Sequence, residues 1–79
     1  VVPVDELDGK INEITAKAVS GPPRAIALSK AMLNRSFSNS LAEALDQEGT
    51  SQTFNFTTSD VIEAMKAFKE KRSPEFKGW

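Results

Sequence analysis

The residues of this chain that could bind a charged ligand lie near its C-terminal end. The stretch from Phe68 to Lys77 places several lysines and an arginine among phenylalanines, next to a predicted helix end. Lysine offers a mobile positive charge to a phosphate group, and an aromatic ring can cover the face of a base such as adenine. The stretch therefore predicts a site for a phosphorylated, ring-bearing ligand. It is also typical of a solvated cationic helix end, because cations complement the helix dipole there.

No residue of the chain is a good candidate for catalysis. There is no cysteine and no histidine, which leaves out the usual thiol nucleophile, general base and metal ligands. The acidic residues Glu43, Glu48 and Glu63 are explained more simply as helix caps or polar-face residues. The four glycines are too scattered to form a phosphate-binding loop. We therefore predict no catalytic residue, no metal site and no cofactor bound by this chain.

The composition predicts a single small domain. Ten cations balance eleven acids in 79 residues, so neither a nucleic-acid surface nor an acidic tail is expected. No apolar run reaches the ~20 residues of a membrane span, and we expect a cytoplasmic or organelle-matrix setting. A chain of this size buries only about 60% of its unfolded surface, so we expect marginal stability without a partner. Because the sequence opens at Val1 without a methionine, we expect a processed product or an excised segment.

The apolar periodicity predicts four helices. The first is predicted to start at a cap by Asp5 and to end at residues 20–23, and the second covers residues 23–35 with an apolar surface broad enough for two neighbours. Its predicted main stripe is Ile26, Ser29, Leu33 and Phe37, with Leu28 and Met32 beside it.

Two capping boxes are predicted to open the remaining helices. Ser40 and Glu43 have the required spacing for the third helix, which reaches Phe56 with a kink or frayed middle at residues 49–51. Asp60 and Glu63 have a similar spacing for the fourth. Its predicted buried face is Val61, Ala64, Met65 and Phe68, and its predicted last-turn cations are Lys69, Lys71 and Arg72, before Pro74. No convincing strand is found, so we predict an all-α fold of four helices with short turns, packed as antiparallel neighbours in a loose bundle.

Residues 67–78 read A-F-K-E-K-R-S-P-E-F-K-G and resemble the A-F-x-E-K-R-x-P-x-F-x-G ending of enoyl-CoA hydratases and isomerases, the crotonase family. Earlier segments resemble the same family in the same order, among them Val1-Val2-Pro3 and Gly21-Pro22-Pro23. The resemblance implies that residues 1–4 end the preceding catalytic core or a linker. It also implies that residues 5–79 are the C-terminal helical domain of a larger α/β enzyme.

The same resemblance implies a role for two residues. Phe68 and Lys71 match family positions that reach coenzyme A (CoA), with lysine near phosphate and phenylalanine near adenine. CoA would be part of an acyl-CoA substrate. The family's C-terminal helices pack between subunits in trimers or hexamers and help to cover the acyl-CoA pocket. Its catalytic carboxylates and oxyanion hole belong to the upstream core, so this segment alone would not be catalytically competent.

Two other functions remain open on the sequence alone. A free-standing helical interaction module would use the apolar stripes to dock a protein. An acyl-carrier-like protein would suit the length, the acidic pI and Ser40 at a helix start. Asn39, however, stands where an aspartate normally precedes the modified serine, and Ser40 is adequately explained as a cap.

Overall fold

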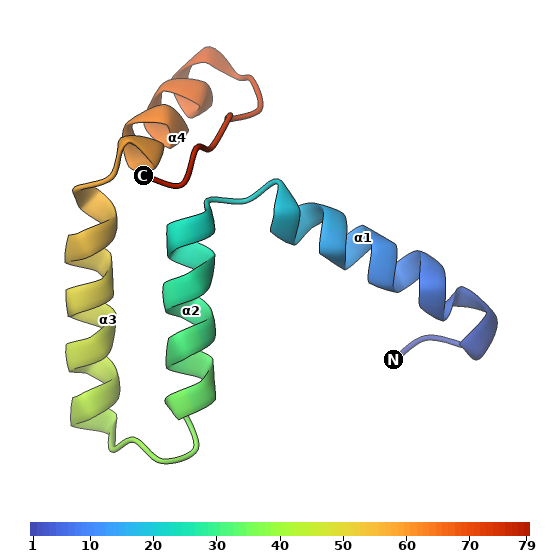
Figure 1. The fold of residues 1–79 in the computed structure, drawn as a ribbon, viewed down its shortest axis with the longest axis horizontal. Coiled ribbons are helices and arrows are strands. Elements are labelled where there is room, and N and C mark those ends of the chain that lie inside the picture. The colour runs from blue at the N-terminus through green and yellow to red at the C-terminus, as the bar shows by residue number, and fades with distance from the viewer.

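The chain folds into four α-helices and contains no strand. The computed structural model describes residues 1–79. A short 3-10 turn, Val4–Glu6, leads into α1 (Leu7–Val19), α2 (Pro23–Arg35), α3 (Leu41–Phe56) and α4 (Ser59–Glu70). Residues 71–79 then run back along α4 as an extended segment that we call the strap (Figure 1). The all-α prediction is confirmed.

Helix α3, which begins with a side-chain cap, starts where the sequence predicts. Ser40 Oγ accepts a hydrogen bond from the Glu43 N–H at 3.2 Å, and the Glu43 carboxylate accepts one from the Ser40 N–H at 2.7 Å. The predicted capping box of α3 is therefore confirmed, and the Ser40 N–H and hydroxyl lower the pKa of Glu43. The predicted Asp5 cap is wrong. Asp5 lies in the 3-10 turn, and α1 begins without a side-chain cap.

Of the kink or frayed middle predicted for α3, the frayed middle is wrong. The helix continues through Gly49 to Phe56, and the Thr53 hydroxyl donates to the Gly49 carbonyl at 2.8 Å. One glycine costs about 1 kcal/mol in a helix interior, which a ladder of this length tolerates.

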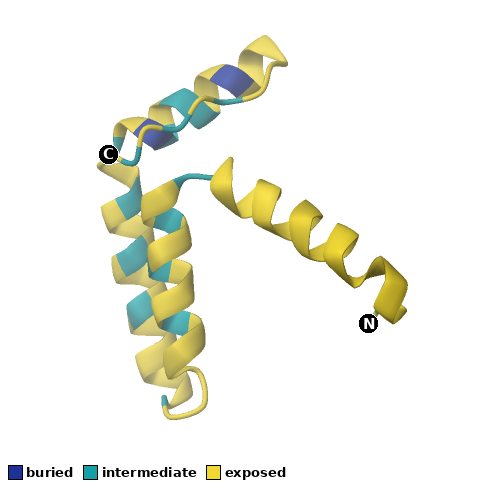
Figure 2. Cartoon of the chain, turned by 45° about the vertical axis from the view of Figure 1, so that its right-hand side comes forward, coloured by how far each residue is buried: buried dark blue, intermediate teal, exposed yellow.

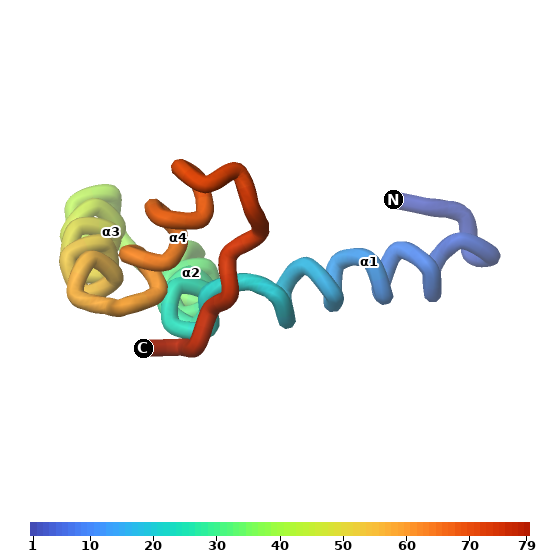
Figure 3. Tube along the Cα trace, turned by 90° about the horizontal axis from the view of Figure 1, so that it is seen from above, coloured from blue at the N-terminus to red at the C-terminus, as the bar shows by residue number.

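The helices do not form the predicted bundle. Only α2 and α3 pack side by side as an antiparallel pair (Figures 1 and 3). Helix α1 projects away from this pair, and α4 lies beyond the end where α2 begins and α3 ends. The half-buried residues of this pair are Ala25, Leu28 and Met32 on α2 and Gln47, Ser51 and Asn55 on α3. The predicted main stripe is exposed at Leu33 and at Phe37, which lies just after α2, whereas Leu28 and Met32, predicted beside it, are half-buried. The short turns therefore produced one antiparallel pair and not a bundle. The turn at residues 20–22 directs α1 away from α2.

The interior of the molecule is very small. Ala67 and Asp60 are the buried residues, with exposed fractions of 0% and 5%. Most of the chain in Figure 2 has the yellow colour of exposed residues. Large apolar side chains are exposed on every helix and in the turn after α2, and they include Leu7, Ile11, Ile14, Val19, Leu33, Phe37, Leu41, Leu45, Phe54, Phe56, Ile62, Met65 and Phe68. None of the helices has the length and apolar character needed to cross a bilayer. The chain therefore has open apolar faces and almost no core.

Candidate ligand site at the end of helix α4

A tight turn ends α4 and starts the strap. Lys71 has φ 54° and ψ 39°, the left-handed conformation. Its N–H donates to the Phe68 carbonyl at 3.3 Å, and the Arg72 N–H donates to the Ala67 carbonyl at 3.1 Å. These two bonds form a Schellman motif, which satisfies helix carbonyls that would otherwise lack partners. Lys71 occupies the position in this motif where glycine is usual.

The two predicted ligand residues lie at this turn and face solvent. The Phe68 side chain is in the last turn of α4 and has an exposed fraction of 87%. Lys71 follows the helix, is exposed, and makes no hydrogen bond or ion pair through its ammonium group. The structure therefore brings an unpaired ammonium and an open aromatic ring to the same helix end.

Arg72, the next cation, is held within the protein. Its guanidinium donates to both oxygens of Glu63, at 2.6 and 3.1 Å, and its Nε donates to Glu70 at 2.7 Å. Glu63 also accepts the backbone N–H of Glu75 at 2.9 Å. The Arg72 guanidinium and then the Glu75 N–H lower the pKa of Glu63 to about 2, and Glu63 and Glu70 raise the pKa of Arg72. The predicted cationic patch thus contains one paired cation, Arg72, and exposed lysines without an ion pair, among them Lys69 and Lys71.

A second carboxylate fixes the far end of the strap. Asp60 accepts the N–H groups of Lys77 at 2.7 Å and Gly78 at 2.8 Å. The Trp79 carbonyl in turn accepts hydrogen bonds from the Asp60 N–H and the Ser59 hydroxyl. Arg24 of α2 donates to the Gly78 carbonyl at 2.8 Å. The strap is therefore joined to the start of α4 and to α2.

These contacts correct three predictions for α4. Asp60 and Glu63 do not form a capping box, because Thr58 is the N-cap residue and both carboxylates bind the strap instead. The predicted buried face holds only in part, since Val61 and Ala64 are half-buried while Met65 and Phe68 are exposed. The helix ends at Glu70, so Lys71 and Arg72 lie beyond its last turn.

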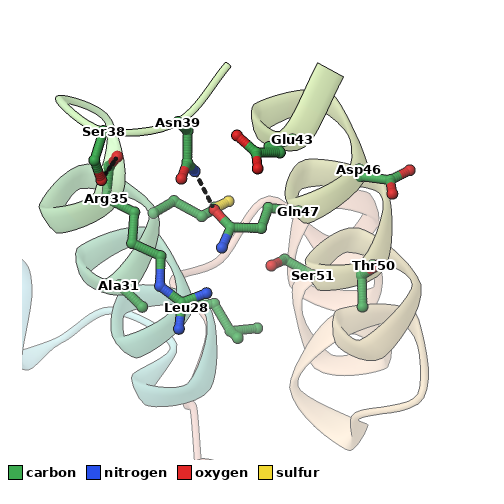
Figure 4. Close-up of a pocket in the computed structure, with 11 residues that line it drawn as sticks. Leu28, Ala31, Arg35, Ser38, Asn39, Glu43, Asp46, Gln47, Thr50 and Ser51 are labelled. Carbon is green, nitrogen blue, oxygen red and sulfur yellow. Dashed lines mark hydrogen bonds between the residues drawn. The ribbon is translucent and has the colours of Figure 1, made fainter. Parts of the chain in front are cut away.

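The largest depression on the surface lies elsewhere, in the groove between α2 and α3 (Figure 4). It encloses about 820 Å³ and includes Leu28 and Met32 on one wall and Gln47 and Ser51 on the other. Asn39 Nδ2 donates to Gln47 Oε1 across its end at 3.0 Å, as the dashed line shows. Sequence patterns did not indicate this groove, because its polar α3 wall lacks an apolar period.

A smaller cavity of about 210 Å³ lies where α2, α3, α4 and the strap meet. Arg24, Asn55, Asp60, Ala64 and Phe76 are among its lining residues. Phe76 is half-buried there, so it is a packing residue of the strap. Neither Phe68 nor Lys71 lines this cavity or the α2–α3 groove.

The carboxylates of α4 next to this turn are already in ion pairs. Those of Glu63 and Glu70 are both engaged by Arg72. No cluster of acidic side chains could hold a metal ion. The exposed groups at the end of α4 include the Lys69 and Lys71 ammonium groups and the Phe68 ring, a combination that suits an anion attached to a flat ring.

Comparison with known proteins extends over the whole chain. The sequence model of the family described as enoyl-CoA hydratase/isomerase matches residues 1–79. A short-chain-enoyl-CoA hydratase of Clostridium acetobutylicum is 40% identical over 75 residues, which cover 95% of this chain and 29% of that protein. A probable enoyl-CoA hydratase of Mycobacterium bovis is 37% identical over 78 residues, which cover 96% of this chain and 30% of that protein.

The same likeness holds in three dimensions. The crystal structure of an enoyl-CoA hydratase from Bacillus anthracis matches with a TM-score of 0.90 and 37% identity, covering 100% of this chain and 31% of that one. The chain therefore spans about 30% of the length of the relatives it matches. Sequence model, relatives and solved structure agree, and the chain belongs to the enoyl-CoA hydratase/isomerase family.

Proposed function

We propose that this chain is the C-terminal helical segment of an enzyme that acts on acyl-CoA thioesters. In this proposal it contributes contacts between subunits of a trimer or hexamer, and it contacts CoA through Phe68 and Lys71. The catalytic groups belong to the rest of the enzyme, so the segment alone is not catalytically competent. Family membership favours this function over a free-standing interaction module or a carrier protein.

The observation that carries the CoA contact is the exposed pair at the end of α4. Phe68 is 87% exposed and Lys71 is exposed, and neither side chain makes a hydrogen bond or ion pair within the chain. A helix C-terminus bears partial negative charge, so attraction for a phosphate must come from side-chain cations. Arg72 is paired with two glutamates, and Lys71 is the cation that the turn itself presents. Lysine is well suited to bind phosphate as a point charge.

The proposed subunit and core contacts are supported by the shape of the chain. Two of 79 residues are buried, and apolar side chains are open on all four helices. The chain nevertheless matches the Bacillus anthracis structure over its full length at a TM-score of 0.90. An open arrangement shared with part of a longer enzyme is expected if the missing part, or another subunit, covers these faces.

The CoA contact can be tested by NMR titration of the chain with coenzyme A. We expect the amide signals of Phe68, Lys71 and Arg72 to shift on addition of CoA. Pantetheine, which lacks the adenine and the phosphates bound to it, should leave these signals unchanged. Lys71→Ala should weaken CoA binding about fivefold, since an exposed ion pair contributes up to roughly 1 kcal/mol.

Lys69→Ala is the matched control for this experiment. It removes the same charge from the same helix end but not from the proposed contact, so CoA affinity should stay within about twofold of the unaltered chain. A folded chain whose Phe68 and Lys71 amides do not respond to CoA would overturn the assignment of the CoA contact to these residues. If the two alanine variants weakened CoA binding equally, the effect would come from the overall charge of the helix end and not from a contact with Lys71.

A further inference from the structure

We infer that Glu63 and Arg72 are positioning residues that hold Lys71 in its ligand-binding orientation. The inference rests on the proposed function, because it concerns how the proposed CoA contact is held in place. The sequence had suggested a helix cap for Glu63, which the structure replaces with a contact to the strap.

The residues on either side of Lys71 are tied to each other. Arg72 follows Lys71 directly and donates Nε to the carboxylate of Glu70, which precedes it, at 2.7 Å. The terminal nitrogens of Arg72 grip both oxygens of Glu63 at 2.6 and 3.1 Å. A two-pronged contact between guanidinium and carboxylate fixes direction as well as distance. The turn that carries Lys71 is therefore held from both ends against α4.

The backbone of Lys71 needs such support. A residue with a side chain is disfavoured at a φ of 54°, and such conformations persist only where the surroundings hold them. Glycine would adopt this turn at a lower cost. A strap that served only to cover α4 would thus be more stable with glycine at position 71. The lysine, with its free ammonium group, indicates that the turn also serves to present that group.

The Glu63 contact is distinct from the rest of the strap. Glu63 holds Arg72 and the N–H of Glu75, close to Lys71 in the chain. The far end is held separately, because Asp60 accepts the N–H groups of Lys77 and Gly78, and Arg24 donates to Gly78. Loss of the Glu63 contact should therefore free the turn at Lys71 while the end of the strap stays attached.

A double-mutant cycle with CoA as the ligand tests the inference. The four proteins are the unaltered chain, Glu63→Gln, Lys71→Ala and the double variant, with dissociation constants measured by NMR titration. Glu63→Gln should weaken CoA binding about threefold, less than Lys71→Ala does. In the Lys71→Ala background the same change should have no further effect, because Glu63 acts through Lys71. If Glu63 had only a structural role, Glu63→Gln would weaken CoA binding by the same factor in the unaltered chain and in Lys71→Ala.

Two further variants separate positioning from folding. Arg72→Lys keeps the charge but loses the two-pronged fit, so its CoA affinity should lie between those of the unaltered chain and Glu63→Gln. Glu13→Gln is the matched control. Glu13 also accepts hydrogen bonds from two cations, Lys10 at 2.8 Å and Lys17 at 2.6 Å, but it lies on the projecting helix α1. Its loss should leave CoA binding unchanged.

The dynamics of the turn give a readout that does not need a ligand. The heteronuclear NOE of the Lys71 amide should fall in Glu63→Gln, while those of Lys77 and Gly78 stay high. Absence of CoA binding by the unaltered chain would overturn the proposed function. If the chain binds CoA, equal affinity in Glu63→Gln with an unchanged Lys71 NOE would overturn the positioning role alone.

Discussion

Among the residues other than glycine, Lys71 alone has a positive φ, which is 54°. In the left-handed region the Cβ atom approaches the following carbonyl oxygen, at a cost of roughly 1–2 kcal/mol. The Schellman bonds from Lys71 and Arg72 and the Glu63–Arg72 contact offset this cost. Stability and the proposed ligand contact therefore favour different residues at the same position.

At this residue scale we expect Lys71→Gly to stabilise the chain. Relief of the left-handed backbone, less the greater freedom of glycine in the unfolded chain, should raise the free energy of unfolding by about 0.5–1 kcal/mol. Lys66→Gly, in the middle of α4, should lower it by up to ~1 kcal/mol, because glycine is a poor helix former. Urea unfolding followed by circular dichroism measures both. A loss of stability in both variants would contradict strain at Lys71.

At the scale of elements, α4 and the strap form one unit. The strap closes on α4 through the Schellman turn at one end and the Asp60 contacts at the other. Helix α1 has no such support. It contacts mainly the 3-10 turn that precedes it, and its ion pairs, from Glu13 to Lys10 and Lys17, are exposed and internal. Exposed pairs add little, so α4 with its strap should be the more persistent element.

Acid should loosen the strap at Glu63. The pKa of Glu63 is lowered from 4.5 to about 2, chiefly by Arg72, so the folded state favours the charged carboxylate. The stability that this contributes is fully present above pH 4.5 and is lost as the pH falls toward about 2. The Glu75 amide signal should therefore titrate with a midpoint near pH 2, and Glu63→Gln should abolish that step. A midpoint at the ordinary value would show that Arg72 does not hold Glu63 in solution.

At the scale of the whole molecule, the chain is open and flat. Its extents are 41 × 39 × 18 Å and its radius of gyration is 15.5 Å. A compact domain of this length would have a radius of gyration of about 12 Å. The difference comes from α1, which projects from the remainder of the chain, as seen from above in Figure 3. Apolar stripes on a projecting helix favour association with another surface.

We expect the isolated chain to self-associate weakly. Sedimentation velocity should show an average mass that rises with concentration over the micromolar to millimolar range. Ile14→Glu places a charge in the apolar stripe of α1 and should shift this rise to higher concentration. Thr15→Glu adds the same charge at the neighbouring exposed position and should have a smaller effect. A strictly monomeric chain at millimolar concentration would contradict the proposed role of these faces in packing.

Features of this chain that depend on neighbouring residues could be predicted from its sequence. The bounds of α2 follow from the Pro23 start and its periodicity, and the start of α3 follows from the Ser40–Glu43 box. Both depend on contacts within one helical turn, where spacing alone decides which groups meet. The family was also readable from the ending at residues 67–78, because several specific residues recur there in fixed order.

How the acids of α4 are used depends on the tertiary fold. The spacing of Asp60 and Glu63 suits a cap as well as a pair of strap anchors, and local spacing cannot choose between them. Their partners, Arg72, Glu75, Lys77 and Gly78, return only because the chain reverses at Lys71. The sequence pattern likewise could not predict the direction in which α1 projects from the rest of the chain. Periodicity marks which face of a helix is apolar, but what covers that face depends on chain that lies far away in sequence.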